Sequence, residues 1–394
     1  MSDLNLFMPC AAGAETFLAE EVQRITAREA KAHRAGVTLQ ASWRDAMLLN
    51  LHSRLAQRVL IELTNAPYRS EADLYTVATA VAWEDWFDVK RTFKVEITAQ
   101  HSPLKSLNFA ALKIKDAIAD RFRDKRGERP SVDTQHPDIR IYAHLTAERV
   151  TLYADTSGEP LFKRGWREDK GEAPLKETLA AAMIAASGWQ ADTPLYDPCC
   201  GSGTIAIEAA QIACGIAPGS LRRFAFEKLL PFDAKPWQLL REEAKARHHA
   251  PTAPVFGSDV AFRMVDFARR NAERAGVAHA INLRGGDALQ RMPPSDTPGV
   301  MLVNPPYGER IEAAGVAGRE RAQAEGGGDF FAQLASHWKA HYAGWNAWVL
   351  TPDMKLPSRM RLKESRRVPM WNGPIECRLF RFDMVKGSAR KDAA

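Results

Sequence analysis

Short apolar runs and amphipathic stretches divide the first 155 residues into two sets of elements. The expected strands lie at 4–8, 37–39, 92–97, 139–143 and 150–153. The expected helices are marked by Phe17, Leu18 and Val22; by Leu55, Val59 and Leu60; and by Phe109, Leu112, Ile114 and Ile118. The pattern therefore predicts two small α/β units, one over residues 1–44 and one over residues 45–155.

The turn-forming cluster Asp155–Pro160 precedes a change in periodicity. Beyond it, helical segments alternate with strand-like segments at 194–196, 253–256, 280–283 and 300–303. Such alternation is typical of an α/β domain with a doubly wound parallel sheet. This third domain is expected over 156–386, with a polar tail at 387–394.

Composition narrows the class of protein. Of the 394 residues, 45% are hydrophobic and 26% are charged, which is ordinary for a soluble globular chain of two or three domains. The chain has no apolar run of roughly 18 residues or more, and its N-terminus lacks the features of a signal peptide, so no membrane association is expected. The five cysteines are scattered in neither a disulfide nor a metal-ligand spacing, which predicts no metal site and fits a cytoplasmic location.

The net charge of +6 gathers in three basic clusters. They lie at Arg121–Arg129, at Lys163–Arg167 and over 359–367, and two of them contain an aromatic residue. Each alone is also typical of a solvated helix face, but together they favour a nucleic-acid surface. The candidate RNA-contacting residues are Lys113, Lys115, Arg121, Arg123, Arg126, Arg164 and Arg167.

A glycine-rich loop links the strand at 194–196 to an apolar helix. Its sequence, from Asp197 to Ala206, reads Asp-Pro-Cys-Cys-Gly-Ser-Gly-Thr-Ile-Ala. The glycines allow close approach of a ligand to the backbone, and the helix N-terminus offers free N–H groups. The spacing also fits a dinucleotide fingerprint, but that interpretation needs an acid about 20 positions on. No acid lies between Glu208 and Glu227, which weakens it.

Asn304-Pro305-Pro306-Tyr307 follows the strand at 300–303 directly. Because Asn304 precedes a proline, its backbone is held extended, with a side-chain amide and a peptide carbonyl in fixed geometry. Two hydrogen-bond acceptors beside one flat ring suit the planar amine of a nucleobase. The two carbonyl oxygens would accept the hydrogens of the amine, and the ring of Tyr307 would stack on the base. The alternative is a proline-rich turn with a packed tyrosine.

The two motifs together resemble those of amino-methyltransferases of the Rossmann-like class. The segments 107–118, 164–167, 173–182, 187–189 and 371–377 extend the resemblance to THUMP-containing RNA guanine-N2 methyltransferases. The sequence is most similar to the bacterial family that modifies the guanosine conventionally numbered 2445 of 23S rRNA. Nearly the whole chain, to about residue 386, shares the likeness. Some members carry a second methyltransferase domain at the C-terminus, and because this chain ends without one, a second activity is not expected.

The resemblance implies a ferredoxin-like domain at 1–44, a THUMP RNA-binding domain at 45–155, and a Rossmann-like class I methyltransferase domain with a mostly parallel seven-stranded sheet. It implies S-adenosyl-L-methionine as cofactor. Asp197, Gly201 and Gly203 would line its methionine part, Asp259 would accept from the ribose, and Asp287 would face the adenine. The implied cofactor-binding residues are Asp197, Pro198, Cys200, Gly201, Ser202, Gly203, Thr204, Asp259, Asp287 and Asn304. The segment 214–249 is then expected to be an insertion at the sheet edge, and the polar stretch 311–328 a lid.

The implied reaction is in-line methyl transfer to guanine N2, which requires placement of two reactants rather than a strong base. The catalytic residues would be Asn304, Pro305, Pro306 and Tyr307, while Cys199 and Cys200 are expected to pack the loop. The expected partner is 23S rRNA or a large-subunit precursor, with no obligate protein partner. Three alternatives stay open: a transfer-RNA guanine-N2 methyltransferase, a DNA adenine-N6 methyltransferase, and a non-catalytic RNA-binding assembly factor.

Overall fold

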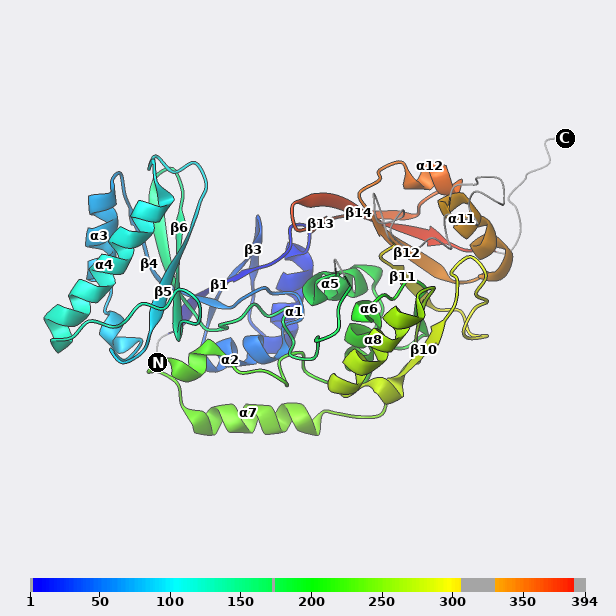
Figure 1. Cartoon of the computed structure of the whole chain (residues 1–394), viewed down its shortest axis with the longest axis horizontal. Coiled ribbons are helices and arrows are strands. Elements are labelled where there is room, and N and C mark those ends of the chain that lie inside the picture. The colour runs from blue at the N-terminus through cyan, green and yellow to red at the C-terminus, as the bar shows by residue number, and fades with distance from the viewer. Residues whose placement is uncertain (1–2, 172–173, 306–329, 386–394) are drawn as a thin grey trace. The chain divides into compact units, whose positions relative to one another are not determined.

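The computed structural model describes residues 3–171, 174–305 and 330–385, which form two compact units (Figure 1). Unit 1 comprises Met1–Cys10, Leu18–Leu161 and Arg222–Ala244, and unit 2 comprises Ala11–Phe17, Phe162–Leu221 and Lys245–Ala394. Within the described ranges, no helix combines the length and the apolar character needed to cross a membrane.

Unit 1 is built on one seven-stranded sheet in the order β2-β3-β1-β4-β7-β6-β5. The strands are β1 Leu4–Pro9, β2 Lys31–His33, β3 Gly36–Ala41, β4 Leu60–Pro67, β5 Phe93–Ala99, β6 Ile139–Leu145 and β7 Arg149–Asp155. All neighbours are antiparallel except β5 and β6. Because β4 pairs with β1 on one side and β7 on the other, the sheet runs unbroken through both expected N-terminal units.

Two helices of this unit begin at capping boxes. Ser42 and Ser70 form them with Asp45 and Asp73, which start α2 (Trp43–His52) and α3 (Glu71–Ala80). Two further helices are α1 (Glu15–Thr26) and α4 (Leu107–Arg126). The expected boundary at 44–45 falls inside α2, so the chain does not change domain there.

The helix expected around Leu55–Leu60 is wrong. α2 ends at His52, and the following turn is held by the buried carboxylate of Glu21. That carboxylate accepts hydrogen bonds from the Ser53 hydroxyl at 2.7 Å and from the Arg54 N–H at 2.9 Å. Residues 55–59 therefore form a buried loop in which the Leu55 N–H donates to the Glu21 side chain at 3.3 Å rather than to a helical carbonyl, and Leu60 begins β4.

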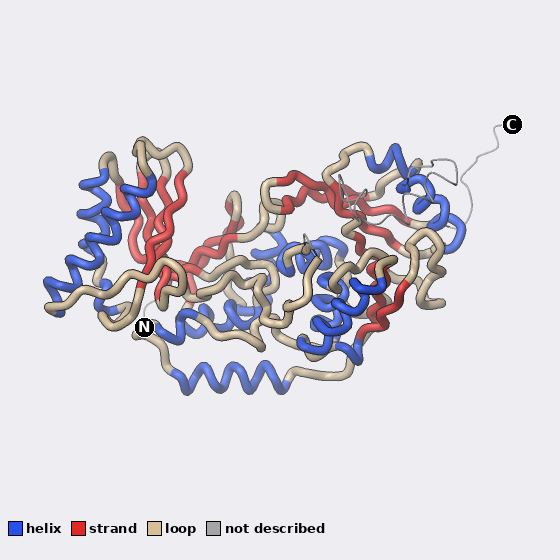
Figure 2. The backbone as a smooth tube through the Cα atoms, in the orientation of Figure 1, coloured by secondary structure: helices blue, strands red, loops and turns tan. Residues whose placement is uncertain are grey.

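Unit 2 contains a second seven-stranded sheet in the order β10-β9-β8-β11-β12-β14-β13, and Figure 2 draws the strands of both sheets in red. Its strands are β8 Leu195–Asp197, β9 Val255–Asp259, β10 Ile281–Gly285, β11 Val300–Val303, β12 Asn346–Thr351, β13 Arg366–Asn372 and β14 Ile375–Asp383. The first five are parallel, and β14 and β13 close the sheet as an antiparallel hairpin. The expectation of a Rossmann-like, mostly parallel seven-stranded sheet is confirmed.

Helices cover both faces of the second sheet. α6 (Thr204–Ala213) packs on β8 and β9, and α8 (Phe262–Arg274) packs on β9 and β10, with α5 (Glu177–Ser187) beside α6. On the opposite face, Tyr196 and Met301 of the sheet form one core with Trp338 of α11 (Phe330–His341) and with Leu356 and Met360 of α12 (Leu356–Met360). β9 and β10 follow β8 on one side of the sheet, and β11 and β12 lie on its other side. The gap between β8 and β11 is therefore the topological switch point of the sheet.

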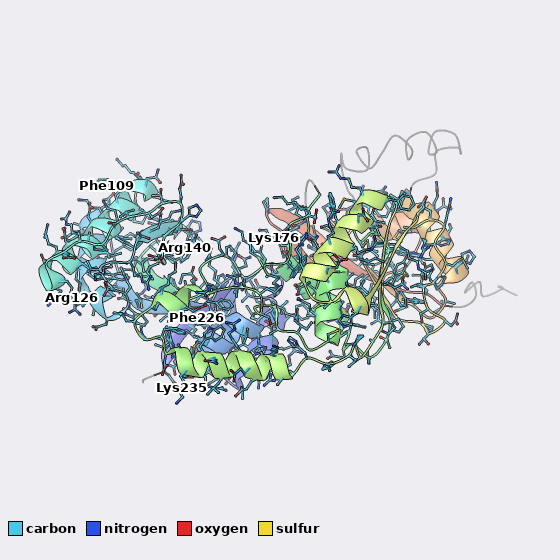
Figure 3. All side chains as sticks on the ribbon, turned by 60° about the horizontal axis from the view of Figure 1, so that its bottom comes forward. Phe109, Arg126, Arg140, Lys176, Phe226 and Lys235 are labelled. Carbon is cyan, nitrogen blue, oxygen red and sulfur yellow. The ribbon has the colours of Figure 1, made fainter. Side chains whose placement is uncertain are left out.

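The segment 222–244 belongs to unit 1, which corrects the expected insertion at the sheet edge. The rings of Phe226 and Trp237, which lies on α7 (Ala234–Ala246), meet edge to face at 4.9 Å. The Leu230 N–H donates to the Trp86 carbonyl at 2.9 Å. The Phe226 N–H also donates to the Thr156 carbonyl at 2.9 Å, so backbone hydrogen bonds tie the segment to unit 1, and Figure 3 labels Phe226 and Lys235 within it.

Candidate functional site

The glycine loop joins β8 to α6 at the switch point. Gly201 and Gly203 have φ values of +53° and +90°, a region that side chains disfavour. A Cβ on Gly203 would lie 2.9 Å from the Cβ of Ala268 on α8. Only glycine therefore allows this loop to pack against α8 while its backbone remains open for a ligand.

Two carboxylates stand at the ends of the neighbouring strands β8 and β9. Asp197 is 2% exposed, and burial raises its pKa to about 8, with a further contribution from Asp259. Burial also raises the pKa of Asp259, although its oxygens accept from the N–H groups of Gly201 and Ala261, both at 2.9 Å. Buried acids with raised pKa values at one sheet edge are typical of a binding site.

Asp287 lies beyond the end of β10, where its carboxylate accepts from the Leu289 N–H at 2.9 Å. The ends of three adjacent strands thus carry Asp197, Asp259 and Asp287 in succession. This places the three acids predicted from the sequence along one edge of the sheet.

Asn304 and Pro305 follow β11, the strand on the other side of the switch point. β11 runs parallel to β8, so the two strands end at the same edge as Asp197. The Oδ1 atom of Asn304 is buried and has no hydrogen-bond partner among the described residues. A buried acceptor left open beside a glycine loop indicates a place for a donor from a ligand. Pro306, Tyr307 and the expected lid at 311–328 lie outside the described residues.

The thiols of Cys199 and Cys200 are not poised as nucleophiles. Burial raises the pKa of each, and the nearby Asp197 raises it further. The Cys200 N–H donates to the Ser258 carbonyl at 2.8 Å, and the side chain packs near Gly257. Both thiols therefore act through packing within the loop.

Arg164 and Arg167 do not face solvent, which corrects their assignment as RNA contacts. Arg164 is 1% exposed, and its Nε lies 3.0 Å from Oε1 of the buried Glu208 on α6. Arg167 donates from Nε to Glu177 at 2.7 Å. Its terminal nitrogens reach the hydroxyls of Ser202 at 2.9 Å and Thr204 at 2.7 Å. Arg167 thus braces the glycine loop, and the charges of both arginines are used inside unit 2.

Asn271 is a further part of this brace that the sequence analysis missed. It is fully buried on α8, and its amide donates to the carbonyls of Asp169 at 2.8 Å and Ser202 at 3.1 Å. Asp169 itself pairs with Arg270 and Arg274, which hold its pKa down at about 2. A lone asparagine within the helical pattern of 262–274 gives no signal of such a role.

The basic residues of α4 differ in their availability. Arg121 is paired with Glu84 at 2.6 Å and is 17% exposed, so its assignment as an RNA contact is also corrected. Lys115 lies 2.7 Å from Asp116, and Arg123 lies 3.3 Å from Asp120. Lys113 lies over the ring of Phe109, with Nζ 5.3 Å from the ring centroid.

The fold and the edge site together define a Rossmann-like domain of the class I methyltransferase type. The family model described as "RMKL-like, methyltransferase domain" matches residues 164–381, a THUMP domain matches 68–155, and the RlmL ferredoxin-like domain matches 5–60. The chain belongs to the family of the RMKL-like methyltransferase domain, and the resemblance seen in the sequence is confirmed.

Individual relatives agree with this membership. The chain is 41% identical over 380 residues to the ribosomal RNA large subunit methyltransferase K/L of Shewanella pealeana. The match covers 95% of this chain and 52% of that protein, so the chain spans about half the length of the curated relatives it matches.

Solved structures are similar over nearly the full chain. A protein assigned as a methyltransferase and complexed with SAH has a TM-score of 0.86 and 28% identity, over 98% of this chain and 100% of that one. A Listeria monocytogenes protein assigned as an N6-adenine-specific DNA methylase has a TM-score of 0.84 and 29% identity, over 96% of each chain.

Proposed function

We propose that this chain transfers a methyl group from S-adenosyl-L-methionine to the exocyclic N2 amine of a guanosine in 23S rRNA, of the 2445 type, forming N2-methylguanosine. The observation that carries the proposal is the buried Oδ1 of Asn304 at the switch point, which has no hydrogen-bond partner within the described ranges of the chain. A planar amine would supply the hydrogen bond that this acceptor lacks.

The cofactor fits the edge formed by β8, β9 and β10. Asp197 would hold the ammonium of its methionine part, because a nearby cation restores the ionised form that burial disfavours. The open backbone at Gly201 and Gly203 would receive the same part of the molecule, with Pro198, Cys200, Ser202 and Thr204 completing the loop. Asp259 would accept from the ribose hydroxyls and Asp287 from the adenine amine. When bound, the cofactor supplies an electrophilic methyl group on a sulfonium.

The protein's own contribution is placement of the amine. The Asn304 carboxamide and the backbone of Pro305 would accept the amine hydrogens, and Pro306 and Tyr307 would complete the motif by shaping the approach and stacking on the base. No nucleophilic side chain is required, since the amine itself attacks, which agrees with the raised pKa values of the two loop thiols. Holding the two reactants in line and excluding water supply the rate enhancement. The target base must leave its stack to reach the pocket.

The substrate assignment rests on unit 1 and on the relatives. A THUMP domain precedes the catalytic domain, and the curated relatives are named for large-subunit ribosomal RNA. We place the enzyme in the cytoplasm, acting on 23S rRNA or a large-subunit precursor without an obligate protein partner. Lys113, Lys115, Arg123 and Arg126 on α4 remain the proposed RNA contacts.

Mass mapping of modified nucleosides tests the proposal. Ribosomal RNA, transfer RNA and DNA would be compared from cells without the gene, with the full chain restored, and with the Asn304→Ala chain restored. We expect one N2-methylguanosine in 23S rRNA to be lost, to return with the full chain, and to stay absent with the variant.

Other outcomes identify the alternatives. Loss of N2-methylguanosine from transfer RNA, or of N6-methyladenine from DNA, would change the substrate. The second of these would agree with the assignment of the Listeria protein as a DNA methylase. Unchanged nucleosides together with a defect in subunit assembly would indicate a non-catalytic role.

A further inference from the structure

The N-terminal end of α4 exposes apolar side chains that a helix of a folded unit ordinarily buries. Leu107, Phe109 and Leu112 are 37%, 47% and 51% exposed. Among the described residues, Phe109 and Phe262 are the most exposed phenylalanines, and Phe262 belongs to the cofactor edge of unit 2. Clustered exposure of this kind marks a contact surface more often than isolated exposure does.

The exposed side chains lie on one face of the helix. Phe109, Leu112 and Lys113 are spaced by three and four residues and therefore neighbour one another. Ala110 and Ile114, on the other face, are fully buried and anchor the helix in unit 1. The outward face is thus presented by a fixed element, as the position of Phe109 in Figure 3 illustrates.

The surroundings of this face are basic. From His101 to Lys115 the chain has three lysines and no acidic residue, and of these three only Lys115 has an acidic partner among the described residues, Asp116 at 2.7 Å. Lys105 is exposed, and Lys113 lies over the Phe109 ring. The C-terminal half of α4 differs, because Arg121 pairs with Glu84 while Arg123 and Arg129 both pair with Asp120. The basic side chains in the C-terminal half of α4 are therefore largely neutralised by acids. Lys105 and Lys113, near the N-terminal end of the helix, have no such partner in the part of the chain that the structure describes.

We propose that this surface, the α4 platform (Lys105, Leu107, Phe109, Leu112 and Lys113), binds an unpaired nucleotide of the RNA substrate. The base stacks on Phe109, and the flanking phosphates lie near Lys105 and Lys113. The inference rests on the proposed action on RNA and specifies which part of the RNA unit 1 reads.

The chemistry of the platform favours an unpaired RNA nucleotide over other occupants. Lysine is depleted from protein–protein interfaces, whereas an aromatic ring beside lysines is typical of surfaces that bind single strands. Paired RNA hides its base faces within the helix, so a stacking ring requires a loop, bulge or end. Contact with a ribosomal protein or an anionic lipid surface is an outcome that the test must separate.

The test compares full-length variants in binding to a 23S rRNA fragment with an open loop and to a matched fragment whose loop is closed by pairing. Phe109→Ala removes the ring, Phe109→Leu keeps apolar area without it, and Phe109→Trp enlarges it. Leu239→Ala on α7, where the side chain is 53% exposed, is the control. We expect Phe109→Ala and Phe109→Leu to weaken binding of the open loop by about 5- to 150-fold, the range for loss of one stacked base. Phe109→Trp and the control should bind as the wild type does.

Salt dependence separates stacking from charge. Lys113→Gln should lower the slope of log affinity against log salt by about 0.7, because one phosphate contact to a single strand is lost. Phe109→Leu should weaken binding and leave the slope unchanged. Wild-type binding by Phe109→Leu, or equal losses on the open and the closed fragment, would overturn the platform. The platform would also be overturned if the Phe109 variants lost binding to anionic vesicles or to ribosomal proteins while their affinity for RNA stayed intact.

Failure of the platform is distinguishable from failure of the proposed function. If the wild type methylates 23S rRNA while the Phe109 variants bind RNA normally, the platform alone is wrong. If the wild type neither binds nor methylates RNA, both are wrong.

Discussion

Asp197 and Asp259 show how burial prepares a site for a cation at the scale of single residues. Burial raises the pKa of Asp197 to about 8, so below that pH the cofactor-free site holds a proton on this carboxyl. The ammonium of the cofactor favours the ionised form, and binding must therefore release that proton. Since the two carboxyls influence each other, the titration belongs to the pair and not to one residue.

This argument predicts a pH dependence of cofactor affinity. Between about pH 6 and pH 8 the affinity for S-adenosylhomocysteine should rise by up to about tenfold per pH unit, and then level off. Calorimetry in buffers of different ionisation enthalpy should detect release of a proton at pH 7. Asp197→Asn should bind weakly and without this slope, whereas Asp266→Asn, an exposed acid on α8, should behave as the wild type does. An affinity independent of pH would remove Asp197 from the ammonium site.

Asn304 allows binding and catalysis to be separated. Asn304→Ala should abolish methylation, because the amine loses its acceptor, while the affinity for S-adenosylhomocysteine stays within a few-fold. The variant should not lower the melting temperature, since the Oδ1 atom that it removes has no partner among the described residues. A loss of cofactor affinity as large as the loss of rate, measured by calorimetry, would contradict the assignment to the amine.

The family resemblance singled out the three acids, and the structure puts Asp197 and Asp259 at the last positions of β8 and β9 and Asp287 just beyond β10, where the ends of parallel strands converge. The sequence pattern misjudged Arg164 and Arg167 because charge clustering carries no information about burial. A buried arginine needs its partner, and the partners Glu208, Glu177 and Ser202 lie 10 to 44 positions away. Pairing at such distances depends on the tertiary fold.

At the scale of elements, the segment 162–171 braces the glycine loop from outside. Arg167 reaches Ser202 and Thr204 at the start of α6, and Asn271 joins Asp169 to Ser202 from α8. The loop that would hold the cofactor is therefore fixed by hydrogen bonds from two other elements. Such support keeps a ligand-binding backbone in place in the absence of its ligand.

Arg167→Lys tests the brace, because lysine keeps the charge beside Glu177 but cannot also span both hydroxyls. We expect the dissociation constant of S-adenosylhomocysteine to rise about tenfold or more, the effect of losing one charge-assisted hydrogen bond. RNA affinity and its salt slope should stay unchanged. Arg269→Gln, an exposed arginine on α8, provides the control. Weakened RNA binding with unchanged cofactor affinity would restore the role that charge clustering suggested for Arg167.

Element prediction succeeded where periodicity and burial coincide. β6 alternates buried and half-buried positions along its length, and its pattern predicted a strand correctly. β4 was missed because only its first two residues are buried and a bulge interrupts its pairing. The helix expected at 55–60 fails because its apolar residues lie partly in a loop bonded to Glu21 through the Leu55 N–H and partly in β4, and no local pattern reveals the contact with Glu21.

At the scale of the whole molecule, each unit is built from stretches that are separated in the sequence. Residues 222–244 lie between β8 and β9 in sequence and yet cluster with unit 1. They are tied to unit 1 by the Lys228 ammonium, 2.6 Å from Asp138, and by the Leu230 N–H, which donates to the Trp86 carbonyl at 2.9 Å. A fragment beginning near residue 161 would lack both partners, and the full chain is therefore the proper object for experiments on division of labour.

Hydrogen exchange on the full chain checks this membership. Phe87→Leu, at a fully buried ring 4.8 Å from Phe122, should destabilise unit 1 by about 1–3 kcal/mol. Because sub-global opening follows contiguous packing, amide protection should fall in β6, in α4 and in 222–244 together, while β11 and β12 stay protected. The mirror variant Trp338→Leu in the core of unit 2 should lower protection in β11 and β12 and leave 222–244 unchanged. If peptides from 222–244 instead open with β11 and β12, that segment is energetically part of the catalytic domain, as its place in the sequence first suggested.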